Sequence, residues 1–340
     1  MPHTPRTRPS RRRTWSAAAA ATSAGLAATA LLAFPGSAHA ADTLGASAAE
    51  SGRYYGAAVA PNLLGEADYA ATLNREFNSI VAENVMKWDA TEPRQGQFTF
   101  QGGDQLVAHA QSNGMSVRGH TLVWHAQQPS WVSGLTGGNL RQAMLDHIDG
   151  VAGHYAGQID SWDVVNEAFE WDGSRRQSNL QQQIGNGWIE DAFRAADPGA
   201  TLCYNDYGTD GVNAKSDAIY RMVQDFLARS VPIDCVGFQS HLDSNSDLGS
   251  YRQNLQRFAD LGVDVQITEL DIGGSGTAQA DAYRTVTEAC VAVSRCTGIT
   301  TWGITDKYSW RGQDTPLLFD GNYQKKQAYN AVLEALNSAP

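Results

Sequence analysis

Apolar, β-branched runs alternate eight times with amphipathic helical patterns over most of this 340-residue chain. The strand-like runs cover residues 54–60, 79–83, 116–124, 159–167, 200–206, 234–241, 263–271 and 298–306. The helical patterns cover residues 67–77, 105–112, 140–155, 189–196, 215–229, 251–261, 279–294 and 325–336. A doubly wound sheet would carry a Gly-rich phosphate turn after its first strand, and none is present. The pattern therefore predicts an α/β fold of the closed (β/α)8 type, a TIM barrel.

The first 40 residues have the composition of a secretory signal peptide. Residues 2–16 contain five arginines and no acid, residues 17–34 are rich in Ala and Leu, and residues 38–40 have the small-x-small form of a cleavage site. A membrane anchor is the alternative, but the apolar run is mostly Ala and is followed at once by that tripeptide. We expect a secreted, extracellular protein with one catalytic barrel domain over residues 41–340. The general and twin-arginine export routes both stay open.

The charge balance after residue 40 is strongly acidic. Five of the 25 basic residues and none of the 36 acidic ones lie in the signal peptide, so 20 basic and 36 acidic residues remain, a formal net charge of −16. Such a surface repels nucleic acid and anionic lipid. We therefore expect no nucleic-acid partner, no membrane contact once the signal is removed, and a soluble monomer.

Four cysteines in a chain destined for an oxidising compartment favour disulfides over metal sites. Cys203 and Cys235 lie on strands expected to be neighbours, and Cys290 and Cys296 are six residues apart near a helix end. These two pairings are the economical choice among three connectivities, with buried free thiols as the alternative.

Two of the strand-like runs end in glutamates that no structural rule requires. Residues 162–167 end in Glu167, and residues 265–271 contain Glu269 and Asp271. The carboxyl ends of the strands of a parallel barrel lie at one face, where such barrels keep their chemistry. Glycoside cleavage needs two carboxyls, one to protonate the leaving oxygen and one to attack the sugar or to activate water. The pair therefore predicts a glycosidase.

Six motifs, in order, resemble glycoside hydrolase family 10, the endo-β-1,4-xylanases, of the secreted bacterial type. They are residues 83–88 (Glu-Asn-Val-Met-Lys-Trp), 119–125 (Gly-His-Thr-Leu-Val-Trp-His), 162–167, 204–207 (Tyr-Asn-Asp-Tyr), 239–241 (Gln-Ser-His) and 267–271 (Ile-Thr-Glu-Leu-Asp). The resemblance runs from about residue 55 to 336. It implies endo-hydrolysis of β-1,4-xylosidic bonds in xylan and xylo-oligosaccharides by a retaining mechanism without a cofactor. Glu167 would be the general acid and base, and Glu269 the nucleophile.

The same resemblance implies binding roles. His241 and Asp271 would orient the nucleophile, and Asn166 would bond the 2-hydroxyl of the sugar at the reacting subsite. The other implied substrate contacts are Glu83, Asn84, Lys87, His120, Trp124, Gln127, Gln239, Trp302 and Trp310, with Asn205 and Tyr207 on the acceptor side. The sequence departs from the family at Gly208, where the family often has Asn, and this leaves the acceptor-side affinity open.

Three alternatives belong to other functional classes or specificities. A retaining endoglucanase or mixed β-1,4-glycanase would share the barrel and both glutamates. A metal-dependent hydrolase could use His120, His125, His241, Asp271 and Asp306, but no His-x-His or His-Glu-x-x-His spacing is present, and we expect no metal. A non-catalytic sugar-binding barrel would have no need for both glutamates.

Overall fold

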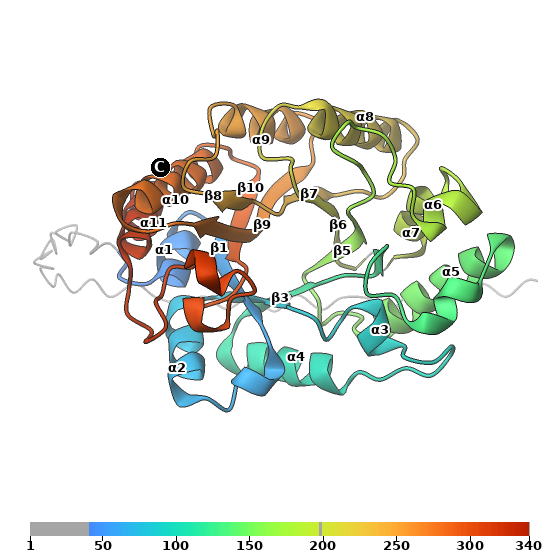
Figure 1. The fold of residues 1–340 in the computed structure, drawn as a ribbon, viewed down its shortest axis with the longest axis horizontal. Coiled ribbons are helices and arrows are strands. Elements are labelled where there is room, and N and C mark those ends of the chain that lie inside the picture. The colour runs from blue at the N-terminus through green and yellow to red at the C-terminus, as the bar shows by residue number, and fades with distance from the viewer. Residues whose placement is uncertain (1–40, 197–198, 340) are drawn as a thin grey trace, which may run out of the picture. The chain divides into compact units, whose positions relative to one another are not determined.

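The eight expected strand regions form a closed parallel barrel in the computed structural model, which describes residues 41–196 and 199–339 (Figure 1). The barrel strands are β1 (Tyr54–Val59), β2 (Ser79–Ala82), β3 (Ser116–Gly119), β5 (Ser161–Asn166), β6 (Thr201–Asp206), β7 (Cys235–Phe238), β9 (Asp264–Gly273) and β10 (Cys296–Thr301). Each is parallel to its neighbours, and β10 pairs with both β9 and β1, which closes the barrel. The predicted (β/α)8 fold is confirmed.

Helices surround the barrel and cover the outer side of its strands (Figure 1). They are α1 (Leu44–Glu50), α2 (Ala67–Glu76), α3 (Trp88–Thr91), α4 (Gln101–Asn113), α5 (Gly137–His154), α6 (Asn179–Ile184), α7 (Trp188–Ala195), α8 (Ala214–Ala228), α9 (Tyr251–Ala259), α10 (Gly276–Val291) and α11 (Gln327–Asn337). Of these, α1, α3 and α6 were not expected from the sequence. Short 3-10 turns, η3 (Asp306–Tyr308) and η4 (Gly312–Asp314), shape the loop after β10.

Two expected strands are interrupted before they reach the cleft. The run predicted over residues 116–124 divides into β3 and β4 (Val123–Trp124), and β4 pairs with β5. The run predicted over residues 234–241 divides into β7 and β8 (His241–Asp243), because Ser240 takes a left-handed φ of 62°. The glycine at the end of β3 has a steric cause: a Cβ on Gly119 would lie 2.1 Å from the ring of Trp162. In both places the chain bends so that the next side chains face the barrel mouth.

Both expected disulfides are formed. Cys203 and Cys235 lie directly opposite each other on β6 and β7, with their Cα atoms 4.5 Å apart. Cys290 near the end of α10 joins Cys296 at the start of β10, with Cα atoms 5.2 Å apart. The first bond ties neighbouring strands and the second fixes a helix end to the strand that follows it.

The predicted signal peptide, residues 1–40, lies outside the described residues. Within residues 41–196 and 199–339, none of the helices combines the length and the apolar character that crossing a membrane requires.

Candidate active site

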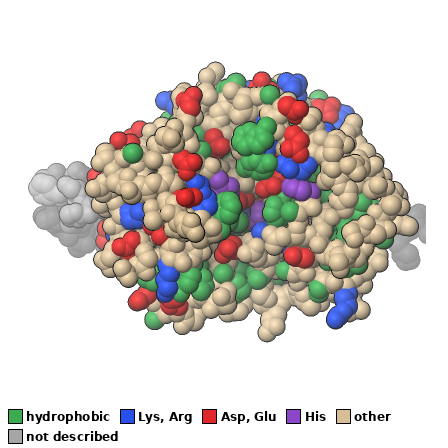
Figure 2. All heavy atoms as spheres, in the orientation of Figure 1, with side chains coloured by type: hydrophobic (Ala, Val, Ile, Leu, Met, Phe, Trp, Pro, Cys, Tyr) green, Lys and Arg blue, Asp and Glu red, His purple; other side chains and the backbone are tan. Residues whose placement is uncertain are grey.

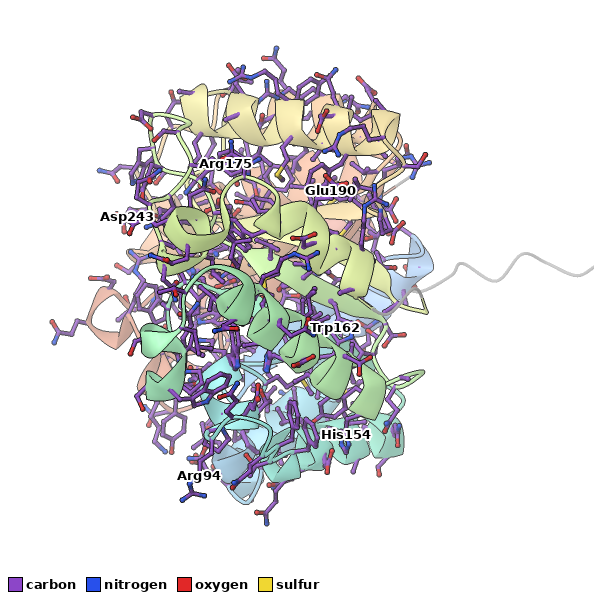
Figure 3. The ribbon with its side chains drawn as sticks, turned by 90° about the vertical axis from the view of Figure 1, so that its right-hand side faces the viewer. Arg94, His154, Trp162, Arg175, Glu190 and Asp243 are labelled. Carbon is purple, nitrogen blue, oxygen red and sulfur yellow. A yellow bond between two sulfur atoms is a disulfide. The ribbon has the colours of Figure 1, made fainter. Side chains whose placement is uncertain are left out.

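A cleft of about 630 Å³ opens at the carboxyl ends of the barrel strands. Figure 2 views this face, where histidine, acidic and hydrophobic side chains gather around a central hollow. The lining residues are Glu83, Asn84, Lys87, His120, Trp124, Gln127, Asn166, Glu167, Trp171, Tyr207, Gly208, Asp210, Gln239, His241, Glu269, Trp302 and Trp310. In the side view of Figure 3, Asp243 at the end of β8 lies at the edge that Figures 1 and 2 show face on. Nearly all of the expected site residues therefore meet in one cleft.

Glu167 follows β5 and takes a left-handed φ of 59°, which turns its side chain into the cleft. Its carboxyl accepts hydrogen bonds from neutral donors. The Trp124 indole Nε1 donates to Oε2 at 2.9 Å, and the Gln239 amide donates to Oε1 at 3.0 Å. The backbone N–H of Glu167 donates to the carbonyl of Asn205 at 2.9 Å. These bonds fix the carboxyl in position, and among the residues that the structure describes no cationic side chain forms an ion pair with it.

Glu269 lies within β9 and is 5% exposed, so only its carboxylate reaches the cleft. The Asn205 amide donates to its Oε1 at 2.8 Å, and Nε2 of His241 lies 3.2 Å from its Oε2. Burial opposes the charge of His241, but hydrogen bonds to Asp271 and Glu269 raise the pKa of this imidazole to about 10. At neutral pH His241 is therefore a cation that holds Glu269 with a charge-assisted hydrogen bond.

Asp271 lies below the cleft and connects three side chains that shape the site. Its Oδ2 lies 3.0 Å from Nδ1 of His241 and accepts a hydrogen bond from Nε1 of Trp310 at 2.8 Å. Nη1 of Arg311 donates to its Oδ1 at 2.8 Å. Asp271 is fully buried, so its charge is balanced by this arginine and this imidazolium. One carboxylate thus orients both the histidine beside Glu269 and the Trp310 wall.

A polar group on the β2 and β3 side is centred on Lys87. Its Nζ donates to Oδ1 of Asn84 at 3.0 Å and to Oε1 of Gln127 at 2.8 Å. Burial lowers the pKa of Lys87, and the charges of Glu269 and Glu83 oppose that shift. Burial also raises the pKa of Glu83. These donors and acceptors point into a partly desolvated site, which suits the hydroxyl groups of a sugar.

His120 is held by a buried ion pair beneath the cleft. Its Nδ1 lies 2.9 Å from Oδ2 of Asp163, and Arg118 contacts the same carboxylate. Arg118 is 3% and Asp163 1% exposed. Trp302 meets His120 edge to face, with ring centroids 5.3 Å apart. The imidazole and the indole are therefore rigid parts of the cleft wall.

Asn205 lies in a different place from the one expected for a substrate contact. It is fully buried and is not among the lining residues. Its amide donates to Glu269 and, at 3.0 Å, to Oδ1 of Asn166, while its Oδ1 accepts from Thr268 at 2.6 Å. Because all of its polar atoms are engaged by protein groups, Asn205 positions Asn166 and Glu269 from below. Tyr207, the other expected acceptor-side residue, does line the cleft.

The arrangement provides two carboxyls in one cleft with different surroundings. One accepts from a tryptophan and an amide, and the other accepts from a buried amide and a cationic histidine. Such a pair can divide the roles of proton donor and nucleophile at a glycosidic carbon.

Comparison with known proteins agrees with this chemistry. The family model described as glycosyl hydrolase family 10 matches residues 43–335. The chain belongs to glycosyl hydrolase family 10. An endo-1,4-beta-xylanase of Agaricus bisporus is 44% identical over 304 residues, covering 83% of this chain and 90% of that protein. Endo-1,4-beta-xylanase B of Thermotoga neapolitana is 39% identical over 287 residues, covering 79% and 83%.

Solved structures place the same barrel in other family 10 enzymes. Native xylanase 10B from Thermotoga maritima superimposes with a TM-score of 0.84 at 39% identity, covering 86% of this chain and 98% of that one. Xylanase 10B from Thermotoga petrophila RKU-1, solved in complex with xylobiose, gives a TM-score of 0.83 at 39% identity, covering 86% and 97%. These values extend the likeness over the entire barrel.

Three residues important to this family 10 site were absent from the sequence-based set. Arg311 balances Asp271, and Asp163 holds His120. Arg176 donates through Nε to the carbonyl of Glu167 at 2.8 Å and through Nη2 to the hydroxyl of Tyr207 at 2.7 Å. Asp163 had a signal in the sequence, because it is a carboxylate inside a strand-like run, two residues before Val165, and a buried charge needs a partner. The two arginines lie in loops, and their spacing carries no such signal.

Proposed function

We propose that this family 10 hydrolase is an endo-β-1,4-xylanase that cleaves xylan with retention of configuration at the anomeric carbon. The observation that carries the proposal is the pair Glu167 and Glu269, which share one cleft but accept hydrogen bonds from different partners. The relatives named above are xylanases, and one of them was solved with xylobiose bound. This favours xylan over the glucan alternative.

In the first step, Glu167 protonates the oxygen between the two sugar units while Glu269 attacks the anomeric carbon. The bond to the leaving oxygen breaks, the acceptor portion departs with a new hydroxyl, and a glycosyl ester to Glu269 forms. His241 and Asn205 hold the attacking carboxylate by its two oxygens. Held in this way, the nucleophile needs little rearrangement on the way to the transition state.

In the second step, Glu167, now ionised, takes a proton from water, and the water oxygen attacks the anomeric carbon. The ester bond to Glu269 breaks and the carboxylate is restored. Two inversions give net retention. Oδ1 of Asn166 accepts hydrogen bonds from the amides of Gln239 at 3.1 Å and Asn205 at 3.0 Å, and Nδ2 of Asn166 donates to Oε1 of Glu167 at 3.4 Å. The second N–H of this amide donates to the 2-hydroxyl of the reacting sugar.

Specificity for xylose rests on the polar group around Lys87 and on the aromatic walls. Lys87, Asn84 and Glu83 bind hydroxyls one unit from the cut, and Trp310 and Gln127 restrict the space that a glucose hydroxymethyl group would occupy. Trp310 is 63% exposed, yet its Nε1 is fixed to Asp271. An anchored ring of this kind rejects a bulkier sugar without first having to be ordered by the ligand.

The wild-type enzyme is expected to release reducing sugar from unbranched xylan, mainly as xylobiose and xylotriose, and to act weakly on carboxymethylcellulose. An ill-fitting substituent is rejected by roughly 10- to 200-fold, so residual glucanase activity is expected. Trp310→Ala should lower both rates and narrow the ratio of kcat/KM between matched aryl xylobioside and cellobioside. A ratio near one in the wild-type enzyme contradicts xylan specificity.

Secretion, as a xylanase of the secreted bacterial type whose first 40 residues are a signal peptide, is part of the same proposal. Its support is the basic start, the Ala-rich run and the small residues at positions 38–40. The two disulfides suit an oxidising compartment. With a formal net charge of −16 after residue 40, the mature enzyme is a soluble monomer that avoids anionic surfaces.

Peptide mapping of the protein from the culture medium tests the signal peptide and the disulfides together. The first residue is expected to be Ala41, and non-reduced digests should contain Cys203 joined to Cys235 and Cys290 joined to Cys296. Alkylation without reductant should label no cysteine. A peptide joining Cys203 to Cys290 contradicts the pairing, and an intact N-terminal segment contradicts signal removal.

A further inference from the structure

An exposed indole on one wall of the cleft is not explained by the chemistry described so far. Trp171 lies in the loop between β5 and α6 and lines the cleft beside Tyr207 and Gly208. It is 62% exposed, although large aromatic side chains usually bury most of their surface. An aromatic face left open inside a sugar-binding cleft is available to a ligand.

The loop that carries Trp171 is short and internally bonded. Phe169 and Arg175 form an antiparallel bridge, and the N–H of Glu170 donates to the carbonyl of Ser174 at 2.9 Å. Gly173 takes a φ of 82°, and a Cβ there would lie 2.6 Å from the carbonyl oxygen of Ala214. The loop therefore packs directly against the start of α8, and the indole is presented by a fixed backbone.

Beneath the indole lies a second ring that is tied to the catalytic region. Trp171 meets Tyr207 edge to face, with centroids 5.5 Å apart. Nζ of Lys215 lies 3.5 Å from the Tyr207 centroid and is paired with Asp206 at 2.7 Å. Arg176 links the Tyr207 hydroxyl to the backbone carbonyl of Glu167. Tyr207 is thus connected to Glu167 through Arg176, and Trp171 contacts the ring of Tyr207.

Gly208 makes this position of the indole possible. Its φ is 63°, and a Cβ added to it would lie 2.4 Å from two ring carbons of Trp171. Any side chain at position 208 would have to displace the ring. The glycine that departs from the usual sequence and the exposed tryptophan are therefore two parts of one feature.

We propose that Trp171, in the space left by Gly208, is a stacking platform for the second xylose unit on the acceptor side of the cut. The proposal rests on the proposed function and specifies its acceptor binding. The first acceptor unit adjoins Glu167, which protonates the oxygen that this unit keeps, and therefore lies near Tyr207. The next unit reaches the ring beyond it. A xylose ring has no hydroxymethyl arm, so its C–H face can lie flat on an indole.

Cleavage of xylotetraose labelled with ¹⁸O at its reducing end tests the platform. Binding with two units on the acceptor side puts the label in xylobiose, and binding with one unit puts it in xylose. Trp171→Ala is expected to lower the ratio of labelled xylobiose to labelled xylose by roughly 2- to 12-fold, the size of one aromatic contact. The ratio does not depend on the fraction of folded enzyme. An unchanged ratio in this variant overturns the proposal.

Gly208→Asn tests the link between the two residues. Asn tolerates the left-handed backbone, but its Cβ would push the indole aside, so the same ratio should fall. The double variant Gly208→Asn/Trp171→Ala should be no worse than Trp171→Ala alone. A Gly208→Asn ratio at or above that of the wild type, or an additive double variant, overturns the link.

Val212→Ala is the matched control, because Val212 is an exposed apolar residue in the loop between β6 and α8, which also carries Gly208. It is 43% exposed and outside the cleft lining. The variant should leave the ratio unchanged, and a fall equal to that of Trp171→Ala overturns the platform. Failure of the wild-type enzyme to cleave xylotetraose or xylan would instead contradict the proposed function. Normal wild-type cleavage with no change in Trp171→Ala contradicts the platform alone.

Discussion

Glu269→Ala is expected to abolish hydrolysis of xylan and of aryl β-xylobiosides alike. The alanine side chain has no oxygen that can attack the anomeric carbon. A better leaving group therefore does not restore the rate. Removing the nucleophile of a serine protease costs roughly 10⁶-fold in kcat, which sets the scale expected here. Asn205 and His241 keep their other partners, Asn166 and Asp271, so the surrounding site stays in place.

Azide should partly restore turnover of an aryl xylobioside by this variant. The small anion fits the space left by the carboxylate and attacks the anomeric carbon from the same side as Glu269, so the product is the inverted glycosyl azide. NMR of the product reads the configuration. Glu50→Ala, an exposed glutamate at the end of α1 outside the cleft lining, is the control and should keep full activity. Most of the xylanase activity surviving in Glu269→Ala would contradict the assignment.

The barrel was predictable because its signal repeats. A strand buried on both faces favours an almost continuous apolar run, and β7, with the sequence Cys-Val-Gly-Phe, has all four residues buried. Eight such runs with helical patterns between them leave few alternative folds. Helix α1 was missed since its seven residues include Gly45 and lack a long apolar period; its place depends on contact with the distant Asn78.

Strand interruptions were not predictable, because their causes lie in other parts of the chain. Residues 116–124 read as one strand, yet the ring of Trp162 occupies the space beside Gly119 and pairing changes from β3 to β4. The bends matter to the site. His120 comes directly after β3 and His241 begins β8, and both side chains line the cleft.

The glutamates could be read from the sequence, but several of their partners could not. Glu167 follows β5 and Glu269 lies in the carboxyl-terminal half of β9, and a parallel barrel brings these parts of its strands together at one face. Arg311 meets Asp271 forty positions away, and only the completed loop after β10 defines that contact. Asn205 has the residue type of a substrate contact, but its burial turns all of its hydrogen bonds inward. The sequence predicts the location of the active site more readily than it predicts which polar side chains form all of their hydrogen bonds within the protein.

Glu167→Ala is expected to lose activity in proportion to how much the leaving group needs a proton. A sugar hydroxyl is a poor leaving group without protonation, so kcat on xylan should fall by roughly 10²- to 10⁴-fold. An aryl leaving group whose phenol has a low pKa departs without protonation, so the rate of the first step on an activated aryl xylobioside should change little. Trp124 and Gln239 would lose an acceptor in this variant, but neither of them supplies a proton that can replace the acid.

The second step separates this variant from Glu269→Ala. Without a base at position 167 water attacks slowly, so the glycosyl ester to Glu269 accumulates and aryl alcohol appears in a burst, followed by a slow phase with a lowered KM. Azide needs no base and should release the ester as the retained glycosyl azide, the opposite configuration from that made by Glu269→Ala. Stopped-flow absorbance and product NMR measure both. Equal losses on xylan and on the activated aryl substrate, with no burst, would mean that Glu167 is not the proton donor. The azide products of the two variants are opposite anomers of the same glycosyl azide. One NMR spectrum of each product therefore assigns the roles of both glutamates.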